Sequence, residues 1–313
     1  MARHILVGDS LGSESENVVK VAQVLGRGLD APLHVVHAFD PPAPMGPPEE
    51  AWVFQREIED KLTRELETSL YTQARRLEVR KTDGHRVEVK TGNPYRVLEE
   101  VARAERPALV VVGSAVDGAR TWRFLGSTAD RLIRRIPSPT FVVAPESVFP
   151  PRRVLYATDL SRLSAGSLRS AAALLKAAGI KPEWQQILFV LDAIDAGSMT
   201  QFSTEQVAQF AAERLERFVE EHGHDLSGTA HRKVVLGSPR AALLEQIERE
   251  RPDLVVLGTH GRGGLDRLLL GSVASAVLKE SPCSALVVPP EAAAEAFEVH
   301  ARSADWAYVS DWA

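Results

Sequence analysis

A glycine-rich segment in the last third of the chain has the residue types that bind phosphate. Residues 258–264 contain glycines at four positions, and Gly271 and Ser272 follow at the predicted start of a helix. Glycines let the backbone approach a ligand closely and turn its amide groups toward an anion. A helix start adds free amides and the positive end of the helix dipole. The Ser272 hydroxyl can donate to a phosphate oxygen and Arg262 or Arg267 can add charge, so we predict a phosphate-binding loop.

Asp159 is a second candidate because it directly follows the first predicted strand of the same region. In open parallel sheets, ligands bind beyond the carboxyl ends of the strands, where Asp159 and the glycine-rich segment both fall. Two plainer interpretations stay open. The glycines would then only make a tight strand-to-helix connection, and Asp159 would cap the N-terminus of the next helix. We expect His260 to face solvent and predict no catalytic residue.

The chain contains two copies of one pattern. Placing Gly92 over Gly237, an offset of 145 residues, also brings Gly113 onto Gly258 without a gap. The same offset pairs Pro94 with Pro239, Leu98 with Leu243, Pro107 with Pro252, Gly126 with Gly271, Ser127 with Ser272 and Pro137 with Pro282. The earliest parts match more loosely, at an offset of 150, which places Asp9 over Asp159. Chance does not produce this agreement, so we predict a tandem repeat.

The joint between the copies falls between Pro145 and Arg152, where two successive prolines form a short stiff linker. We predict a first domain over 1–147, a second over 152–290 and a C-terminal tail over 291–313. The aromatic residues Trp306, Tyr308 and Trp312 of the tail are expected to dock on the protein's own surface, with a partner-binding tail as the alternative.

Strands and helices alternate within each copy. In the second copy, we predict strands over 153–158, 185–191, 230–236, 253–258 and 284–289, with helices over 162–178, 203–222, 239–250 and 271–280. The strand at 254–257 is an unbroken apolar run, the pattern of a parallel sheet covered on both faces. We therefore predict an α/β fold of two tandem doubly wound parallel sheets.

These motifs together resemble the universal stress protein family. The resemblance rests on Gly258, Gly261 and the Gly271-Ser272 pair at their spacing, on the turn at 237–239, and on the first strand ending in Asp159. It covers both copies and resembles the family's tandem members. It implies adenine nucleotide alpha hydrolase-like domains and a stress-response function.

The resemblance also implies a ligand, an adenine nucleotide, normally ATP, with or without Mg²⁺. Thr158 and Asp159 would then face the adenosine, and Val190 would cover the base. The phosphate-binding residues it implies are Gly258, Gly261, Gly271, Ser272 and Val273, and Arg262 and Gly264 complete the predicted cofactor-binding set. Because the Walker, dinucleotide-binding and nucleophile-elbow motifs are all missing from the sequence, we expect at most a weak ATPase.

The first copy departs from this pattern. Val116 stands where the second copy has Gly261, Ala119 replaces Gly264, and Ala108 replaces Asp253. A valine resists positive φ, and its branched side chain fills space that a phosphate would need. We therefore expect nucleotide binding in the second domain only. A slow ATP-hydrolysing enzyme and a nucleotide-independent interaction or ligand-carrying protein remain the alternative functions.

Composition narrows the class of partner. The formal net charge is −5 and the sequence has no long basic run, which argues against a nucleic-acid partner. No apolar stretch reaches the roughly 20 residues that span a bilayer, and the single cysteine, Cys283, fits a reducing cytoplasm as a buried structural thiol. We predict a cytoplasmic protein without a metal site.

The last strand of each copy suggests how the domains assemble. Residues 141–144 and 286–289 are short, apolar and followed by proline, as expected for strands at a sheet edge. Antiparallel pairing of the two strands would bury both edges. We therefore predict an intramolecular pseudo-twofold arrangement of the domains, with further homodimerisation open.

Overall fold

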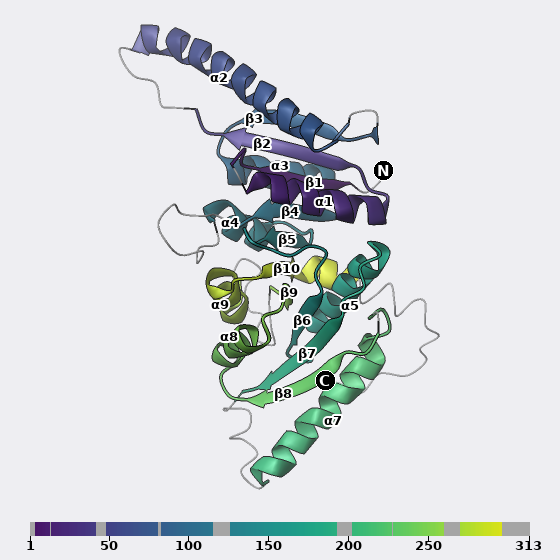
Figure 1. Ribbon diagram of the computed structural model, residues 1–313. Helices are drawn as coiled ribbons and strands as arrows, with labels where there is room; N and C mark the ends of the chain where they lie inside the picture. Colours follow the sequence, from purple (N-terminus) through teal and green to yellow (C-terminus); the bar gives the residue numbers. More distant parts are fainter. Residues whose placement is uncertain are drawn as a thin grey trace. The chain divides into compact units, whose positions relative to one another are not determined.

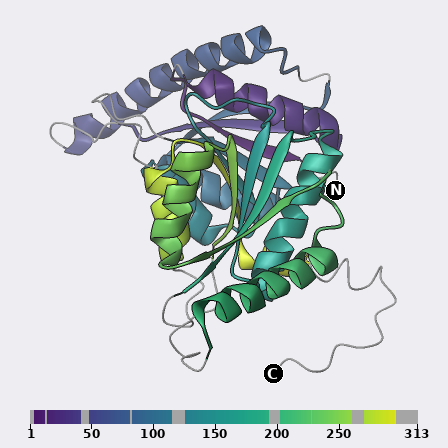
Figure 2. The same cartoon turned by 60° about the horizontal axis from the view of Figure 1, so that its bottom comes forward.

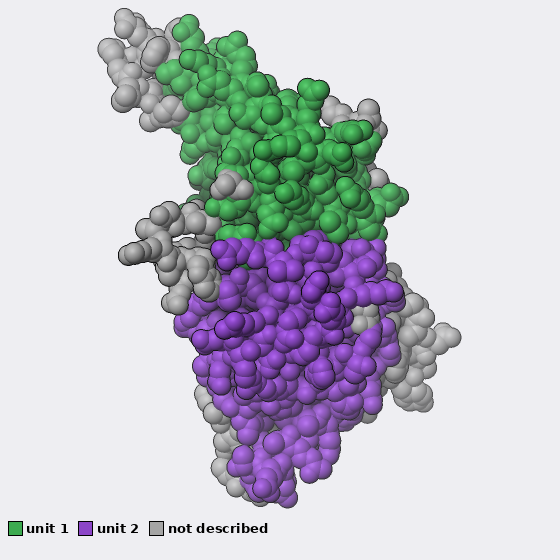
Figure 3. Space-filling model, viewed as in Figure 1, with its two compact units in different colours: residues 1–145 green, residues 146–313 purple. Residues whose placement is uncertain are grey.

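A computed structural model describes residues 4–12, 14–41, 48–80, 83–114, 126–192, 202–226, 228–259 and 270–295. The chain divides into two compact units, Met1–Pro145 and Glu146–Ala313, which Figure 3 colours separately. Of the predicted site, Gly261, Arg262 and Gly264 lie outside the described residues, as do the tail aromatics and Val116 and Ala119 of the first copy.

The first unit is a parallel sheet with crossover helices. Its elements are β1 (Ile5–Asp9), α1 (Ser15–Leu29), β2 (Leu33–Phe39), α2 (Pro48–Arg76), β3 (Arg86–Thr91), α3 (Pro94–Glu105), β4 (Leu109–Gly113), α4 (Ser127–Arg135) and β5 (Thr140–Val143). Within this unit, the strand order is β3-β2-β1-β4-β5, and every neighbouring pair is parallel (Figure 1).

The second unit repeats this topology. Its elements are β6 (Arg153–Thr158), α5 (Arg162–Ala177), β7 (Trp184–Leu191), α7 (Thr204–His222), β8 (His231–Leu236), α8 (Pro239–Glu250), β9 (Leu254–Gly258), α9 (Ser272–Glu280) and β10 (Ser284–Val288). The order β10-β9-β6-β7-β8 is that of the first unit, element for element. Figure 2 shows α8 and α9 on one face of this sheet and α5 and α7 on the other. The predicted tandem doubly wound fold is confirmed.

The apolar strands form the core of each unit because both faces of the sheet are covered by helices. In β9, Leu254, Val255, Val256 and Leu257 are at most 2% exposed, as their unbroken apolar run predicts. Leu257 belongs to a core cluster with Leu155 of β6, Leu188 of β7 and residues of α8 and α9. This cluster fixes the strand ends on which the predicted site depends.

The chain beyond the last strand returns onto its own unit. Residues 290–295 are helical, and the Ala293 side chain is buried. A Cβ atom added to Gly166 of α5 would lie 1.9 Å from the Ala293 carbonyl oxygen, so only glycine permits this contact. The first residues of the predicted tail thus pack against the second unit.

In the described residues, the structure has no helix that is both long and apolar enough to cross a bilayer. Each of the two strands that we expect to pair, β5 and β10, stands at one end of the order within its own unit. Their mutual pairing, the pseudo-twofold arrangement and the domain limits at 147, 152 and 290 remain predictions.

Candidate functional site

The site in the second unit lies where the strand order reverses. From β6, the chain crosses to β7 on one side, and it later returns to place β9 on the other side. The register pairs Tyr156 of β6 with Val256 of β9, so the carboxyl ends of the two strands lie side by side. Such a reversal opens a crevice at the strand ends, which is where open α/β sheets bind ligands.

A backbone hydrogen bond closes the glycine-rich connection at its base. The Gly271 amide donates to the Thr259 carbonyl over 2.8 Å, and the Thr259 amide donates to the Val288 carbonyl over 3.2 Å. A Cβ atom on Gly271 would lie 3.1 Å from the Thr259 oxygen, closer than most side chains tolerate. Gly271 and the end of β9 are thus held in contact, whereas phosphate binding by Gly258 and Gly271 stays a prediction.

The N-terminus of α9 thus faces the carboxyl edge of the sheet. Gly271 is the N-cap residue and has no side chain to accept from the first-turn amides, and the first turn contains no acidic residue. Ser272 is exposed, whereas Val273 is half-buried and packs against the core cluster of the unit. An uncapped helix start with an exposed hydroxyl suits an anion.

Thr158 and Asp159 form the adjoining turn after β6. The Leu160 amide donates to Thr158 Oγ1 over 3.0 Å, and this oxygen lies 2.9 Å from the Ser164 hydroxyl. The Ser161 amide donates to Asp159 Oδ1 over 3.0 Å. These bonds fix both side chains beside the strand end. Within the same turn, Leu160 has a positive φ of 63°.

Asp159 does not cap the following helix. Ser161 is the N-cap of α5, and its hydroxyl accepts from the Ser164 amide over 3.2 Å. The N-cap interpretation of Asp159 is therefore wrong. The sequence carried the signal for Ser161, because serine directly before a predicted helix start is a preferred cap.

Val190 approaches the site from the neighbouring strand. It lies near the carboxyl end of β7, pairs with Val235 of β8 and packs against the core cluster while remaining half-buried. Val273 packs on the same cluster from α9. An apolar edge thus accompanies the polar turn at this end of the sheet.

The structure corrects the alignment of the two first strands. Ile5 pairs with Leu109, and Val154 pairs with Leu254, the equivalent of Leu109. Ile5 therefore corresponds to Val154, an offset of 149 rather than 150. By this register Asp9 corresponds to Thr158 and Ser10 to Asp159.

The hydrogen bonds of the two turns agree with the corrected register. The Leu11 amide donates to Asp9 Oδ1 over 2.7 Å, as the Leu160 amide donates to Thr158. The Gly12 amide donates to the Ser10 hydroxyl over 3.3 Å, as the Ser161 amide donates to Asp159. The first unit therefore has no acidic residue at the position of Asp159.

Asp9 of the first unit is enclosed by its own domain. Gln73 of α2 donates from Nε2 to Asp9 Oδ2 over 2.7 Å, and both side chains are buried. Desolvation by burial raises the pKa of Asp9 despite hydrogen bonds from Leu11, Ser15 and Gln73. Sequence reasoning missed Gln73, because nothing local marks a contact between residues so far apart in the chain.

Asp253 has no part in the nucleotide loop. It precedes β9, and its Oδ2 accepts from the amides of Arg152 and Arg153 over 2.8 and 2.9 Å. These bonds join the starts of β6 and β9, at the opposite end of the strands from Gly258. Using Ala108, its counterpart, as a sign of a degenerate nucleotide loop was therefore wrong.

Comparison with known proteins agrees with the repeated fold. The model of the "Universal stress protein family" matches residues 1–144 and again 151–289. The chain belongs to the universal stress protein family. The two matches identify it as a tandem member, as the resemblance in sequence predicts.

Relatives of the full tandem length exist among the universal stress proteins. One from Mycolicibacterium smegmatis is 30% identical over 297 residues, covering 91% of this chain and 97% of the relative. One from Methanocaldococcus jannaschii is 39% identical, but over 26% of this chain and 45% of the relative. A crystal structure of a universal stress protein from Archaeoglobus fulgidus covers 92% of this chain and 98% of that one, with a TM-score of 0.59 at 17% identity. The last comparison supports the fold alone.

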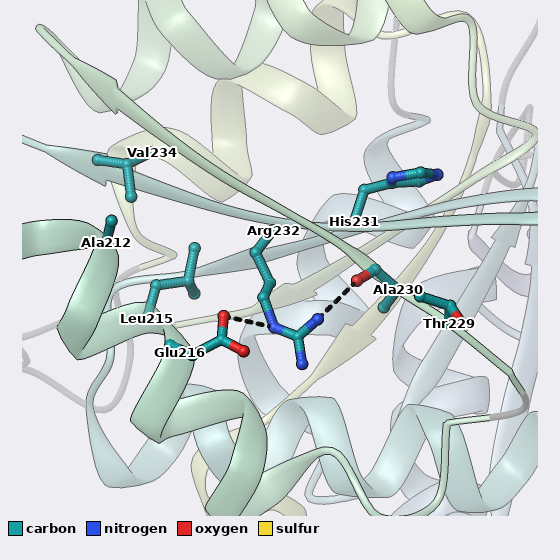
Figure 4. A pocket seen from close by; sticks show the side chains of 8 residues that line it. All are labelled: Ala212, Leu215, Glu216, Thr229, Ala230, His231, Arg232 and Val234. Carbon is teal, nitrogen blue, oxygen red and sulfur yellow. Dashed lines mark hydrogen bonds and ion pairs between the residues drawn. The ribbon is translucent and has the colours of Figure 1, made fainter. Parts of the chain in front are cut away.

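A surface pocket in this universal stress protein lies away from the predicted site. It has a volume of about 460 Å³ and is lined by α7 and by residues around the start of β8 (Figure 4). Its charged groups are already paired, because Arg232 Nε lies 2.8 Å from Glu216 Oε2 and a second guanidinium nitrogen donates to the Ala230 carbonyl. Its position near the start of β8 separates it from the strand ends where a nucleotide is expected.

Proposed function

We propose that the second unit of this universal stress protein binds an adenine nucleotide, ATP with or without Mg²⁺, and that the first unit does not bind it tightly. The observation that carries the proposal is the contact between Gly271 and Thr259, which brings the start of α9 against the end of β9. The helix start and the turn after β6 thus adjoin one strand edge.

The roles follow from the chemistry of each group. The first-turn amides of α9, the Ser272 hydroxyl and the backbone at Gly258, Gly261 and Gly264 would bind phosphate oxygens. Arg262 would add positive charge. Thr158 and Asp159 would meet the ribose or adenine, and the apolar edge formed by Val190 and Val273 would cover the base.

The first unit offers a different environment at the equivalent position. A buried carboxylate, Asp9, replaces Thr158, and Gln73 already donates to it. Ser10 replaces Asp159, so the acidic acceptor expected for the adenosine is missing. These differences support one nucleotide site per chain.

The protein would act as a nucleotide-responsive regulator of a stress response in the cytoplasm. The proposed site residues bind and orient the nucleotide, and none has a catalytic role. The competing function is a slow ATP-hydrolysing enzyme. Sustained ATP hydrolysis at ordinary enzyme rates, of order 1 per second or faster, would refute the regulator proposal. A nucleotide-independent carrier would instead purify without nucleotide, a result that mass spectrometry of the denatured protein would detect.

Calorimetric titration of the full chain with ATP tests the proposal, and we expect one tight site. Gly261→Val, which copies Val116 of the first unit, should abolish this binding without unfolding the protein. Ser272→Ala should weaken it about 10- to 150-fold, from the loss of a hydrogen bond to a charged group worth about 1.5–3 kcal/mol. Ser127→Ala is the matched control because it changes the equivalent residue of the first unit. Two equal tight sites, or equal effects of both serine substitutions, would contradict the proposal.

A further inference from the structure

A cluster of histidines and carboxylates lies at the starts of the strands in the first unit. His4 directly precedes β1, His34 is the second residue of β2, Glu88 lies in β3, and Glu105 ends α3. The His4 backbone is fixed by the Ala108 amide, which donates to its carbonyl over 2.9 Å. This cluster is at the opposite end of the strands from Asp9 and is separate from the proposed nucleotide site.

Three side-chain atoms converge in this cluster. Glu105 Oε2 lies 3.0 Å from His4 Nε2 and 3.0 Å from His34 Nδ1. The three atoms all lie within 4.8 Å of one another. The second ring nitrogen of His34, Nε2, lies 2.7 Å from Glu88 Oε1.

The buried His34 ring lies between two carboxylates. Its side chain is 1% exposed, and each ring nitrogen faces a carboxylate oxygen. A neutral imidazole has one N–H, so it can donate to only one of these carboxylates and presents a lone pair toward the other. Either a second proton on the ring or a metal ion between His34 and Glu105 removes this conflict.

His4 supplies a reason to choose the metal. Its Nε2 atom is buried and, despite its distance to Glu105, has no hydrogen-bond partner of acceptable geometry among the described residues. An imidazole nitrogen beside a carboxylate oxygen offers two of the ligand types that zinc accepts, and a metal ion would give the buried His4 Nε2 atom a partner.

We propose that His4 Nε2, His34 Nδ1 and Glu105 Oε2 bind one divalent transition-metal ion, with zinc as the best match. Zinc takes nitrogen and oxygen ligands at about 2.0–2.2 Å in a tetrahedron, which places ligand atoms about 3.3 Å apart. The 3.0 Å contacts are close to this spacing. Water would fill the fourth position, and Glu88 would be a positioning residue that accepts from His34 Nε2.

Arg86 opposes a cation here, as does Lys90, whose Nζ lies 3.4 Å from Glu88 Oε1. The Arg86 guanidinium donates to Glu105 Oε1 over 3.1 Å, whereas the other oxygen, Oε2, faces the histidines. The two oxygens of Glu105 can thus serve Arg86 and a metal ion separately. The Arg86 side chain is 57% exposed, so solvent screens its charge.

The second unit shows what this position looks like without the metal ligands. By the strand register and the repeat, Arg153, Gln186 and Glu250 correspond to His4, His34 and Glu105. Arg153 lies 3.2 Å from Glu250, and Gln246 donates to the Gln186 amide oxygen over 2.6 Å. The positive charge of Arg153 fills the place of the ion, so we expect one metal site per chain.

Titration of the untagged full-length chain with zinc, and with cobalt(II) as a spectroscopic probe, tests the proposal. We expect one ion per chain and the intense visible absorption of four-coordinate cobalt. The double variant H4R/H34Q copies the second unit and should abolish the absorption. E105Q, on a more exposed ligand, should do the same if the double variant fails to fold. E88Q should retain the ion with about 10- to 100-fold lower affinity.

The matched control is H231Q, because His231 is exposed and belongs to β8 of the second unit. It should leave stoichiometry and spectrum unchanged, and circular dichroism should show that each variant is folded. Failure of the wild-type chain to give the cobalt spectrum would overturn the proposal. Unchanged binding in folded H4R/H34Q and E105Q would overturn it as well.

Discussion

Gln73→Leu tests the enclosed carboxylate of the first unit. Asp9 and Gln73 are 5% and 8% exposed, and the 2.7 Å hydrogen bond between them is the one that reaches Asp9 Oδ2 from α2. Leucine has a similar size but donates no hydrogen bond, so a buried carboxylate oxygen loses its donor. We expect a cost of about 1.5–3 kcal/mol, the range for hydrogen bonds to charged groups.

Asp9→Asn separates the charge from the hydrogen bond. The asparagine oxygen can still accept from the Leu11 amide, and the Gln73 amide can turn to accept from the new NH₂ group. In this background, Gln73→Leu removes a bond between neutral groups, whose net value is about 0.5–1.5 kcal/mol. A double-mutant cycle should therefore give a coupling of about 1 kcal/mol.

The Asp9 charge also predicts a pH dependence with a definite sign. Because burial raises its pKa, the folded protein binds the Asp9 proton more tightly than the unfolded chain. Its contribution to stability is fully present below the ordinary value of 3.8 and is lost as the pH rises through the raised pKa. Asp9→Asn should therefore gain stability over the wild type with rising pH, although other carboxylates shape the total curve.

Hydrogen exchange of the β1 amides measures these effects within the first unit, with the β6 amides as an internal control. At about 1.4 kcal/mol per tenfold change, Gln73→Leu should speed exchange in β1 about 10- to 150-fold at neutral pH. Equal costs of Gln73→Leu with and without Asp9→Asn would refute the reasoning. So would a wild-type stability that rises relative to Asp9→Asn as the pH increases.

Two substitutions and one labelling experiment test the second unit. Gly166→Ala should push residues 290–295 off α5, because its Cβ would lie 1.9 Å from the Ala293 oxygen; we expect about 1–3 kcal/mol of lost stability and new protease cleavage near 290. Asp253→Ala should lower the free energy of unfolding by about 2 kcal/mol, because the Arg152 and Arg153 amides at the start of β6 lose their acceptor. Unchanged stability in chemical denaturation would contradict this role. Desolvation raises the pKa of the half-buried Cys283 thiol to about 11, so thiol labelling of the folded protein should be slow at pH 8 and accelerate toward that pH, whereas rapid labelling at pH 8 would contradict the raised pKa.

The sequence predicted the elements better than their contacts. Unbroken apolar runs such as Leu254–Leu257 and the repeated glycines gave the strands of the second copy to within one or two residues. The register of β1 was missed by one residue, because Asp9 and Asp159 look alike while the correspondence is set by pairing with β4 and β9. Identical residue types at similar places cannot reveal which neighbour a strand pairs with.

In the candidate sites, too, local motifs could be predicted from the sequence but long-range contacts could not. Gly271 and Ser272 could be proposed from the sequence because a phosphate-binding helix start has a local signature. Gln73 and the proposed metal ligands His4, His34 and Glu105 have none, since each comes from a different element and only the sheet topology brings them together. Sequence spacing finds metal sites whose ligands share one loop or helix, and these residues do not.

The central position of β1 and β6 affects when each sheet can be completed during translation. Each is the first strand of its unit, yet it pairs on one side with a strand, β4 or β9, that follows about 100 residues later at a synthesis rate of about 5–20 residues per second. For several seconds, one edge of the apolar strand β1 or β6 in the nascent chain therefore has no strand to pair with. The first unit can complete its sheet while the second is still being translated, so synthesis separates in time two sets of strands that share one topology.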